Sequence, residues 1–91
     1  MVISAFTKKV YKAVLSIPLG ETRSYQWVAR SIGSPRAVRA VGQVLKRNPY
    51  PLIIPCHRVI ASDGTLGGYS RGLAAKKALL DLERQIRLSM L

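Results

Sequence analysis

Cys56 and His57 are the only cysteine and the only histidine of the chain, and they are neighbours in the segment Pro55-Cys56-His57-Arg58. A thiolate is a strong nucleophile, and an imidazole is the usual base that generates it. The pair therefore indicates nucleophilic thiol chemistry. Each residue alone also has a structural explanation, because a lone cysteine is commonly a small buried apolar residue.

The expected backbone of this segment argues for an indirect contact between the two side chains. Residues 52–54 form an apolar run too short for a helix, so we expect them to be buried and extended and to lead Cys56 out of the core. Neighbouring side chains of an extended chain point to opposite faces, so we expect a water to connect His57 with Cys56. A carboxylate behind the imidazole would fix its tautomer, and Glu83 is the best placed of the four acidic residues. A buried Glu83 would need a partner, which His57 or Arg58 could supply.

The net charge of the chain points to a polyanionic partner. Fifteen Lys and Arg against four Asp and Glu give a formal net charge of +11, which is more than solubility requires. Residues 1–47 carry nine basic and one acidic side chains, and residues 48–91 carry six and three. We therefore expect the binding surface mainly in the first half, with a merely solubilising charge as the alternative.

Composition also excludes several classes of site. One cysteine cannot form an internal disulfide, and one Cys with one His cannot complete a tetrahedral zinc site, so no metal and no cofactor are expected. Residues 1–17 do not resemble a signal peptide, and the apolar runs are too short to cross a membrane. We expect a monomer in a reducing compartment, the cytoplasm or the nucleus, without a membrane partner.

The spacing of apolar residues predicts two helices near the N-terminus. The first ends at Pro18, and a short second helix over residues 25–32 begins after Ser24, a good N-cap, and stops at Gly33. Trp27, in the second helix, is expected in the core. The apolar stripe of the first helix consists of Phe6, Val10, Val14 and Ile17.

A third helix is predicted to have one apolar and one basic face. Ser34 and Pro35 are interpreted as its N-cap and first turn, and it runs to about residue 47. Small residues beside the basic face favour close approach to a large partner, although a solvated amphipathic helix has the same pattern. The apolar face holds Val38, Val41 and Leu45, the basic face holds Arg36, Arg39, Gln43, Lys46 and Arg47, and Ala40 and Gly42 flank the latter.

The second half predicts a small β hairpin and a last helix. Residues 59–60 and 66–69 flank a glycine turn, and a helix begins at about Gly72. Two short helices joined by a tight turn, the second one basic, are typical of a helix-turn-helix. We predict a mainly α fold with a small β wing, a single winged helix-turn-helix-like domain over residues 1–91. The apolar stripe of the last helix consists of Ala75, Leu79, Leu82 and Ile86.

From about Phe6 to Glu83 the chain resembles the C-terminal domain of the O6-alkylguanine-DNA alkyltransferase family. Several motifs carry the resemblance in the family's order, and longer members add an N-terminal domain that this chain does not show. The motifs are Ile54-Pro55-Cys56-His57-Arg58-Val59, Arg36-Ala37-Val38-Arg39-Ala40-Val41-Gly42, Asn48-Pro49, Gly68-Tyr69-Ser70 and Gly72-Leu73.

This resemblance implies a repair protein that acts once. Cys56 would accept the alkyl group from guanine O6 of duplex DNA, and the thioether would not be turned over. His57 would act as base through water, and Glu83 would orient it. Tyr25 would crowd the neighbouring phosphate and donate a proton to the departing guanine.

The resemblance also assigns residues to DNA and to the base pocket. Arg39 would enter the duplex from the minor groove and fill the gap left by the flipped nucleotide. Asn48 would be the hinge between the recognition helix and the cysteine segment. The remaining assignments are Arg36, Ala37, Ala40, Gly42 and Lys46 for DNA, and Arg58, Val59, Tyr69 and Ser70 for the pocket.

Three other functions remain open. Alkyltransferase-like relatives bind lesions without transfer, and they typically have another residue at the acceptor position, so Cys56 favours transfer. A winged-helix transcription regulator would explain the basic helix but not the Pro-Cys-His-Arg segment. A thiol hydrolase would need a further His or Asn partner that the pattern does not offer.

Overall fold

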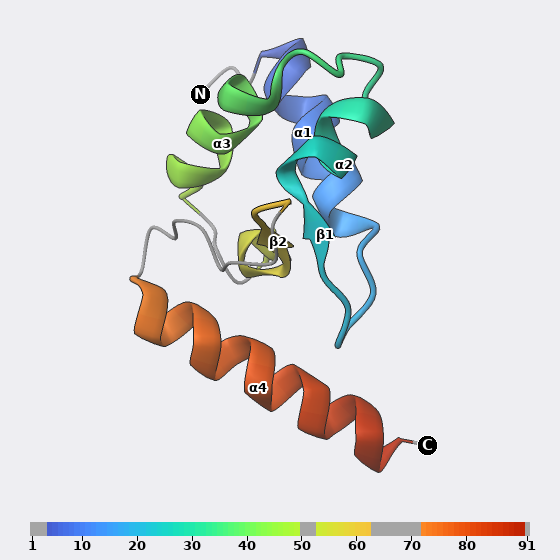
Figure 1. The fold of residues 1–91 in the computed structure, drawn as a ribbon, viewed down its shortest axis with the longest axis vertical. Helices are drawn as coiled ribbons and strands as arrows, with labels where there is room; N and C mark the ends of the chain where they lie inside the picture. The colour runs from blue at the N-terminus through green and yellow to red at the C-terminus, as the bar shows by residue number, and fades with distance from the viewer. Residues whose placement is uncertain (1–3, 50–52, 63–71, 91) are drawn as a thin grey trace.

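Three short helices pack against one another, and a longer helix lies apart from them at one end of the molecule (Figure 1). The computed structural model describes residues 4–49, 53–62 and 72–90. In chain order the elements are α1 (Ala5–Leu15), β1 (Arg23–Ser24), α2 (Tyr25–Ser31), α3 (Val38–Lys46), the 3-10 turn η1 (Cys56–Arg58), β2 (Val59–Ile60) and α4 (Leu73–Ser89).

The first two helices begin at serine caps. Ser4 Oγ accepts the backbone N–H of Thr7, and Ser24 Oγ accepts that of Trp27, at 3.1 and 2.9 Å. Each such cap is worth about 1 kcal/mol, because it satisfies a backbone donor that the helix cannot. Ser24 is thus confirmed as N-cap, and Gly33, at φ +76°, follows α2 in the left-handed region that favours glycine.

The core lies between α1, α2 and α3. The predicted apolar stripe of the first helix is confirmed at Val10, Val14 and Ile17, which are buried. The apolar face of α3 is also buried as expected, whereas Trp27 is only half-buried at the margin of the core. Burial of these aliphatic side chains supplies most of the stability of the unit. The buried apolar residues are Val10, Val14, Ile17, Val28, Ala29, Val41, Leu45, Ile54, Cys56 and Val59.

The predicted start of α3 was wrong. Ser34 does not cap the helix; the Ala37 N–H donates to the Ser34 carbonyl at 2.9 Å, which closes a turn, and α3 begins at Val38. Serine followed by proline is also a typical start of a β-turn, because proline fixes φ at the second position. The turn leaves Arg36 and Ala37 ahead of the helix rather than on it.

The small sheet is parallel. Arg23 pairs with Val59 and Ser24 pairs with Ile60, so the sheet holds the residues just before α2 against the residues that follow the cysteine turn. The second strand of the predicted hairpin and its glycine turn lie outside the described residues. The mainly helical class with a small β element is confirmed.

The segment around Cys56 is not extended, contrary to the sequence prediction. The Cys56 N–H donates to the Ile54 carbonyl at 2.7 Å, and the Arg58 N–H donates to the Pro55 carbonyl at 2.9 Å. The resulting turn buries both Cys56 and His57 and leaves Ile53 74% exposed. Leu52, which was also expected to be buried, lies outside the described residues.

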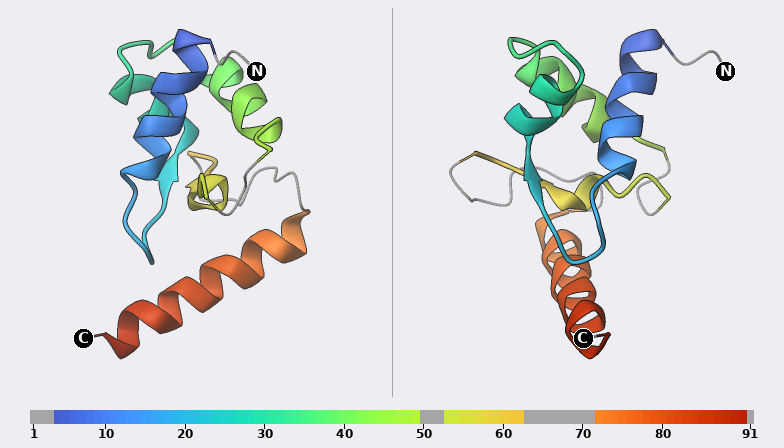
Figure 2. Two further views of the ribbon diagram at one scale, coloured as in Figure 1. Left: turned by 180° about the vertical axis from the view of Figure 1, so that it is seen from behind. Right: turned by 90° about the vertical axis from the view of Figure 1, so that its right-hand side faces the viewer.

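The predicted inner face of α4 is confirmed only in part, since Ala75 and Leu79 are half-buried. Leu82 and Ile86 are exposed, whereas Lys76 and Glu83, two turns apart on another face, are buried. Both charged side chains find partners in η1 and β2, and these contacts decide how the helix docks. Figure 2 shows α4 from two further sides as a rod separate from the three-helix group. Among the described residues, no helix has the length and apolar character needed to cross a membrane.

Candidate nucleic-acid and thiol site

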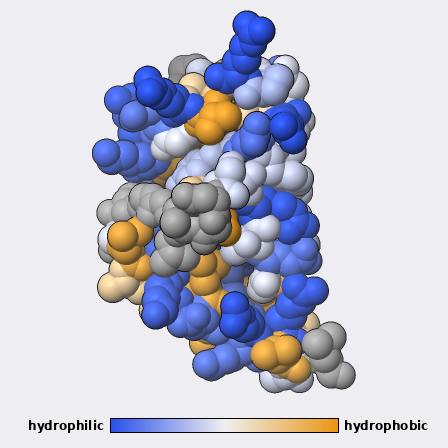
Figure 3. Space-filling view, in the orientation of Figure 1, coloured by the Kyte–Doolittle hydropathy of each residue, from blue (hydrophilic) through white to orange (hydrophobic). Residues whose placement is uncertain are grey.

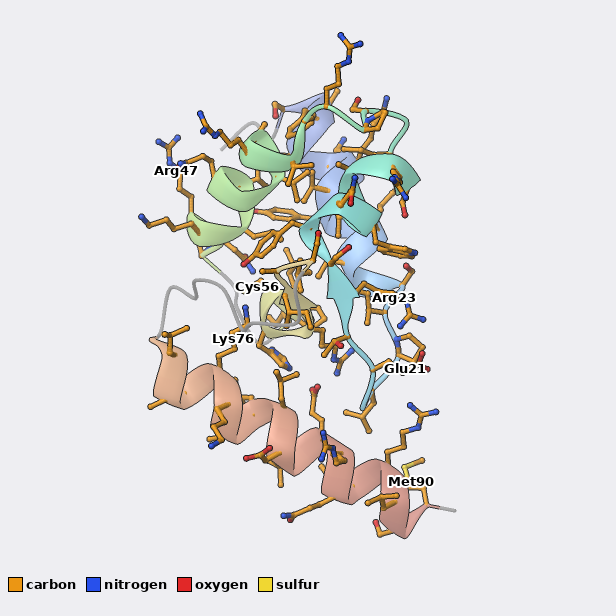
Figure 4. All side chains as sticks on the ribbon, viewed as in Figure 1. Glu21, Arg23, Arg47, Cys56, Lys76 and Met90 are labelled. Atoms are coloured by element: carbon orange, nitrogen blue, oxygen red, sulfur yellow. The ribbon has the colours of Figure 1, made fainter. Side chains whose placement is uncertain are left out.

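Cys56 lies at the bottom of a hollow between α3 and the start of α2. The hollow has a volume of about 510 Å³, and Tyr25, Arg39 and Gly42 line it together with Cys56. Figure 4 shows Cys56 near the centre of the molecule, between the three-helix group and α4. The thiol is 4% exposed, so only a group that enters this hollow can reach it.

One carboxylate behind the cysteine serves two partners. His57 Nε2 lies 2.9 Å from Glu83 Oε2, and Arg58 donates to both oxygens of Glu83 at 2.9 and 2.7 Å. Burial alone would raise the pKa of Glu83, but the hydrogen bonds from Arg58 and His57 outweigh it and hold this pKa below its ordinary value. Glu83 is therefore ionised at neutral pH, and it can hold a proton on the facing nitrogen of His57.

Arg58 also connects this cluster to the first helix. Its remaining terminal nitrogen donates to the carbonyl of Ile17, just beyond α1, at 2.8 Å. The guanidinium thus joins three parts of the chain: the end of α1, the turn η1 and helix α4. The structure places Arg58 behind the cysteine turn, away from the residues that line the hollow.

Asn48 links the end of α3 to the cysteine turn. Its side-chain Nδ2 donates to the Ile54 carbonyl at 3.0 Å, and its backbone N–H donates to the Leu45 carbonyl at 3.2 Å. Burial raises the pKa of the Cys56 thiol, while the Asn48 side chain and the nearby charge of Lys76 oppose this rise. The residue predicted as a hinge thus contacts both the end of α3 and the thiol segment.

Lys76 is the residue that sequence reasoning missed. It is fully buried, and its ammonium donates to the Val59 carbonyl at 2.7 Å and lies 5.8 Å from the centre of the Tyr25 ring. Burial lowers its pKa to about 8, against the attraction of the Cys56 thiolate. Its spacing of seven residues from Glu83 puts both on one helix face, and that periodicity was the available signal.

Tyr25 stands at the first position of α2 and shares the hollow with Cys56. Burial, and then the charge of a Cys56 thiolate, raise the pKa of its phenol above the ordinary value. Tyr25 therefore keeps its proton at neutral pH. The side chain can donate that proton to a group held in the hollow.

The outer surface of α3 is cationic and uncovered. Arg39 and Lys46 are exposed, and a Cβ added at Gly42 would meet nothing within 4 Å. Figure 3 shows hydrophilic residues gathered over this helix, and in Figure 4 the Arg47 side chain points outward at the side of α3. Arg36 and Ala40 are exposed beside them, and Ala37 is half-buried in the preceding turn.

The described residues bring together most of the predicted site. Val59 is buried in β2, and its carbonyl accepts the Lys76 hydrogen bond described above. Tyr69 and Ser70, predicted to line the base pocket, lie outside the described residues. Among residues 4–49, 53–62 and 72–90 there is no group of three His, Cys, Asp or Glu side chains that could hold a metal ion.

A basic helix presented by a three-helix unit, with a buried thiol in the adjoining hollow, is typical of a helix-turn-helix domain that has a thiol beside its ligand-binding surface. The comparisons agree with this class. The chain matches the family described as "6-O-methylguanine DNA methyltransferase, DNA binding domain" over residues 5–85, and it belongs to that family.

Its relatives are alkyltransferases and a lesion-binding protein. A methylated-DNA–protein-cysteine methyltransferase of Methanosarcina barkeri is 60% identical over 78 residues, which are 86% of this chain and 49% of the relative. The Mycobacterium tuberculosis OGT in complex with DNA superposes with a TM-score of 0.89 at 50% identity, covering 92% of this chain and 52% of that one. Atl1 of S. pombe, in complex with DNA containing O6-carboxymethylguanine, superposes with a TM-score of 0.80 at 39% identity, covering 91% and 79%. The chain thus spans about half the length of the curated relatives it matches.

Proposed function

We propose that the chain binds duplex DNA that carries O6-alkylguanine and transfers the alkyl group to Cys56, once per molecule. The observation that carries this proposal is the buried thiol in a hollow that opens beside the basic face of α3. We expect the protein to act where DNA is present, in the cytoplasm or nucleus, and to act as a monomer. The named activity of its relatives supports the same reaction.

The transfer step is a displacement at the alkyl carbon. The Sγ electron pair of Cys56 forms the new S–C bond while the bond from that carbon to guanine O6 breaks. The thiol proton passes through water to His57, and Tyr25 donates a proton to the departing guanine, so that the base leaves neutral. The product is a stable thioether, which limits the protein to one equivalent.

Three neighbours prepare the thiol for this step. Burial disfavours a thiolate, and the ammonium of Lys76 and the amide of Asn48 offset part of that cost. Glu83, held by Arg58, orients the His57 ring so that its other nitrogen can take the proton. His57 and Glu83 are therefore a base and its positioning residue.

The alkylated nucleotide must flip out of the DNA duplex before it can react. A guanine inside a duplex cannot reach a thiol at the bottom of a hollow, so the nucleotide must rotate out, at a cost of a few kcal/mol. Arg39 stands on α3 at the edge of this hollow, where its side chain can fill the gap in the duplex. The low surface at Ala37, Ala40 and Gly42 permits close approach to the groove, and Arg36 and Lys46 contact phosphates.

Intact-mass spectrometry tests the proposal directly. After incubation with a duplex containing O6-methylguanine, the protein gains the mass of one methylene unit, and fragmentation places the methyl group on Cys56. Cys56→Ala gains nothing while it still binds the duplex. Unchanged mass of the natural sequence alongside tight lesion binding would refute transfer.

A lesion-binding protein without transfer is the second candidate. The similarity to S. pombe Atl1, 79% of whose chain is covered, favours it. The free Cys56 and the His57–Glu83 pair favour transfer instead. The same mass measurement separates the two functions.

A further inference from the structure

A second hollow, between α1 and α2, has no part in the proposed reaction. Its volume is about 540 Å³. The right-hand view of Figure 2 shows α1 and α2 side by side with α3 behind them. DNA held by the outer surface of α3 therefore leaves this face uncovered.

The hollow combines an apolar floor with a cationic rim. Ala13, Trp27 and Ile32 line it, and the same three residues pack on the core from outside. Lys9 and Lys12 line it from α1, three residues apart and both exposed. Burial of an apolar side chain against this floor would be favourable, and the lysines of the rim would attract anionic groups.

Among the described residues, neither rim lysine takes part in an ion pair. In the described part of the chain, the ion pairs engage only Glu21 and Glu83, and neither pairs with Lys9 or Lys12. The Arg23 guanidinium stands 5.6 Å from the centre of the Trp27 ring, but Glu21 pairs with it at 2.9 Å, so the positive charge of the rim comes from Lys9 and Lys12. The rim is thus open to carboxylates from outside.

Two hydroxyl groups at the hollow favour a peptide over a phosphate backbone. Ser16 and Ser31 also line it, and their hydroxyl protons are donated to the carbonyls of Ala13 and Trp27. The oxygens that remain are acceptors, which suit a peptide N–H and offer nothing to a phosphate oxygen. A duplex surface presents only small apolar groups, such as the thymine methyl, which would fill the floor less completely than a leucine side chain.

We infer that the hollow between α1 and α2 binds an acidic peptide segment of a partner protein, with an apolar side chain of that segment against Trp27. The inference is independent of alkyl transfer. Because the hollow and α3 face different directions, the peptide and DNA can be held together. The site would therefore recruit a partner to the protein while it is on DNA.

Trp27 is the only tryptophan of the chain, so all tryptophan fluorescence arises from a residue that lines this hollow. The probes are synthetic peptides of about twelve residues, rich in Asp and Glu, with two leucines at helical spacing. Matched peptides of equal charge carry serine in place of leucine. The leucine peptides should change the Trp27 emission at one equivalent, also when unmodified duplex saturates α3, and should bind about tenfold more tightly than the serine peptides.

Paired charge variants supply the control. Lys9→Ser/Lys12→Ser should weaken the leucine peptides by about tenfold and leave alkyl transfer unchanged. Lys77→Ser/Arg84→Ser removes the same charge from exposed positions of α4 and should leave peptide binding as it was. Equal binding of leucine and serine peptides, no emission change, or displacement of the peptide by duplex DNA would overturn the inference.

Discussion

Arg58 and Glu83 form a two-pronged ion pair, with Nε 2.9 Å from one carboxylate oxygen and a terminal nitrogen 2.7 Å from the other. The pair connects the cysteine turn to α4, and the same carboxylate faces His57 at 2.9 Å. A buried carboxylate of this kind is costly unless every lone pair is satisfied. The ion pair therefore stabilises both the docking of α4 and the orientation of the proposed base.

Replacing Arg58 by lysine tests this geometry. Arg58→Lys keeps the charge but cannot reach both carboxylate oxygens and the Ile17 carbonyl, so the free energy of unfolding should fall by about 1–3 kcal/mol. Urea denaturation measures the loss. Arg84→Lys, at an exposed position of the same helix, is the matched control and should change little. Equal stability of the two variants would mean that the two-pronged contact contributes nothing.

The pH dependence of stability should report the ionised Glu83. Its pKa in the folded chain lies below the ordinary value because the hydrogen bonds from Arg58 and His57 outweigh its burial. Its stabilising contribution is therefore complete above the unfolded pKa and is lost as pH falls through the folded pKa. In urea denaturation between about pH 5 and pH 3, the stability advantage of the natural sequence over Glu83→Gln should shrink. A constant difference across this range would assign the acid sensitivity to other groups.

Lys76 should control the reactivity of Cys56. Lys76→Met keeps the shape of the side chain but removes the ammonium that opposes the rise of the Cys56 pKa. At pH 7, where Lys76 carries its proton, alkylation by iodoacetamide and alkyl transfer should therefore both be slower in the variant. Because the pKa of Lys76 is about 8, this support in the natural sequence fades above that pH. Lys77→Met, one residue away and exposed, should react like the natural sequence; equal rates for Lys76→Met and the natural sequence would contradict the role.

The sequence predicted α1, the cap of α2, the basic face of α3 and the contact of Glu83 with the cysteine segment. These predictions follow from the spacing of apolar residues, from a serine at a helix start, and from the presence of only four acidic residues in the sequence. It placed Glu83 inward but did not predict that Lys76 is buried beside it while Leu82 and Ile86 are exposed, because both of these outrank Lys76 on any hydrophobic scale. Only the carbonyl of Val59 and the side chain of Arg58, distant in sequence, make the charged face the inner one.

The prediction of an extended segment at Cys56 was wrong for a related reason. Short apolar runs are ambiguous between a strand and an irregular buried segment. Two hydrogen bonds to the carbonyls of Ile54 and Pro55 form a 3-10 turn. In an extended strand, the alternation of side chains would instead have pointed His57 away from Cys56. His57 is 2% exposed as a result, and it lies with Cys56 on the inner side.

Arg39→Ala should separate base delivery from chemistry. Arg39 lies at the edge of the hollow and not behind the thiol, so its loss should slow repair of duplex DNA far more than reaction with free O6-benzylguanine. Removal of one wedge contact worth about 2 kcal/mol corresponds to about thirtyfold. Single-turnover rates on both substrates measure the effect. Equal losses would show that Arg39 does not assist flipping.

Gly42 should show a conflict between stability and DNA binding. A glycine inside a helix costs about 0.5–1 kcal/mol relative to alanine, and an added Cβ would meet nothing within 4 Å, so Gly42→Ala should raise the free energy of unfolding by about that amount. The same methyl group would project from α3 beside the hollow that the flipped base enters. Urea denaturation should therefore show a more stable protein, and fluorescence anisotropy should show weaker binding of lesion-bearing duplex. Gln85→Ala, at an exposed position of α4 that does not line the hollow, is the control. A stabilised Gly42→Ala variant that binds the duplex unchanged would place the DNA away from this surface of α3.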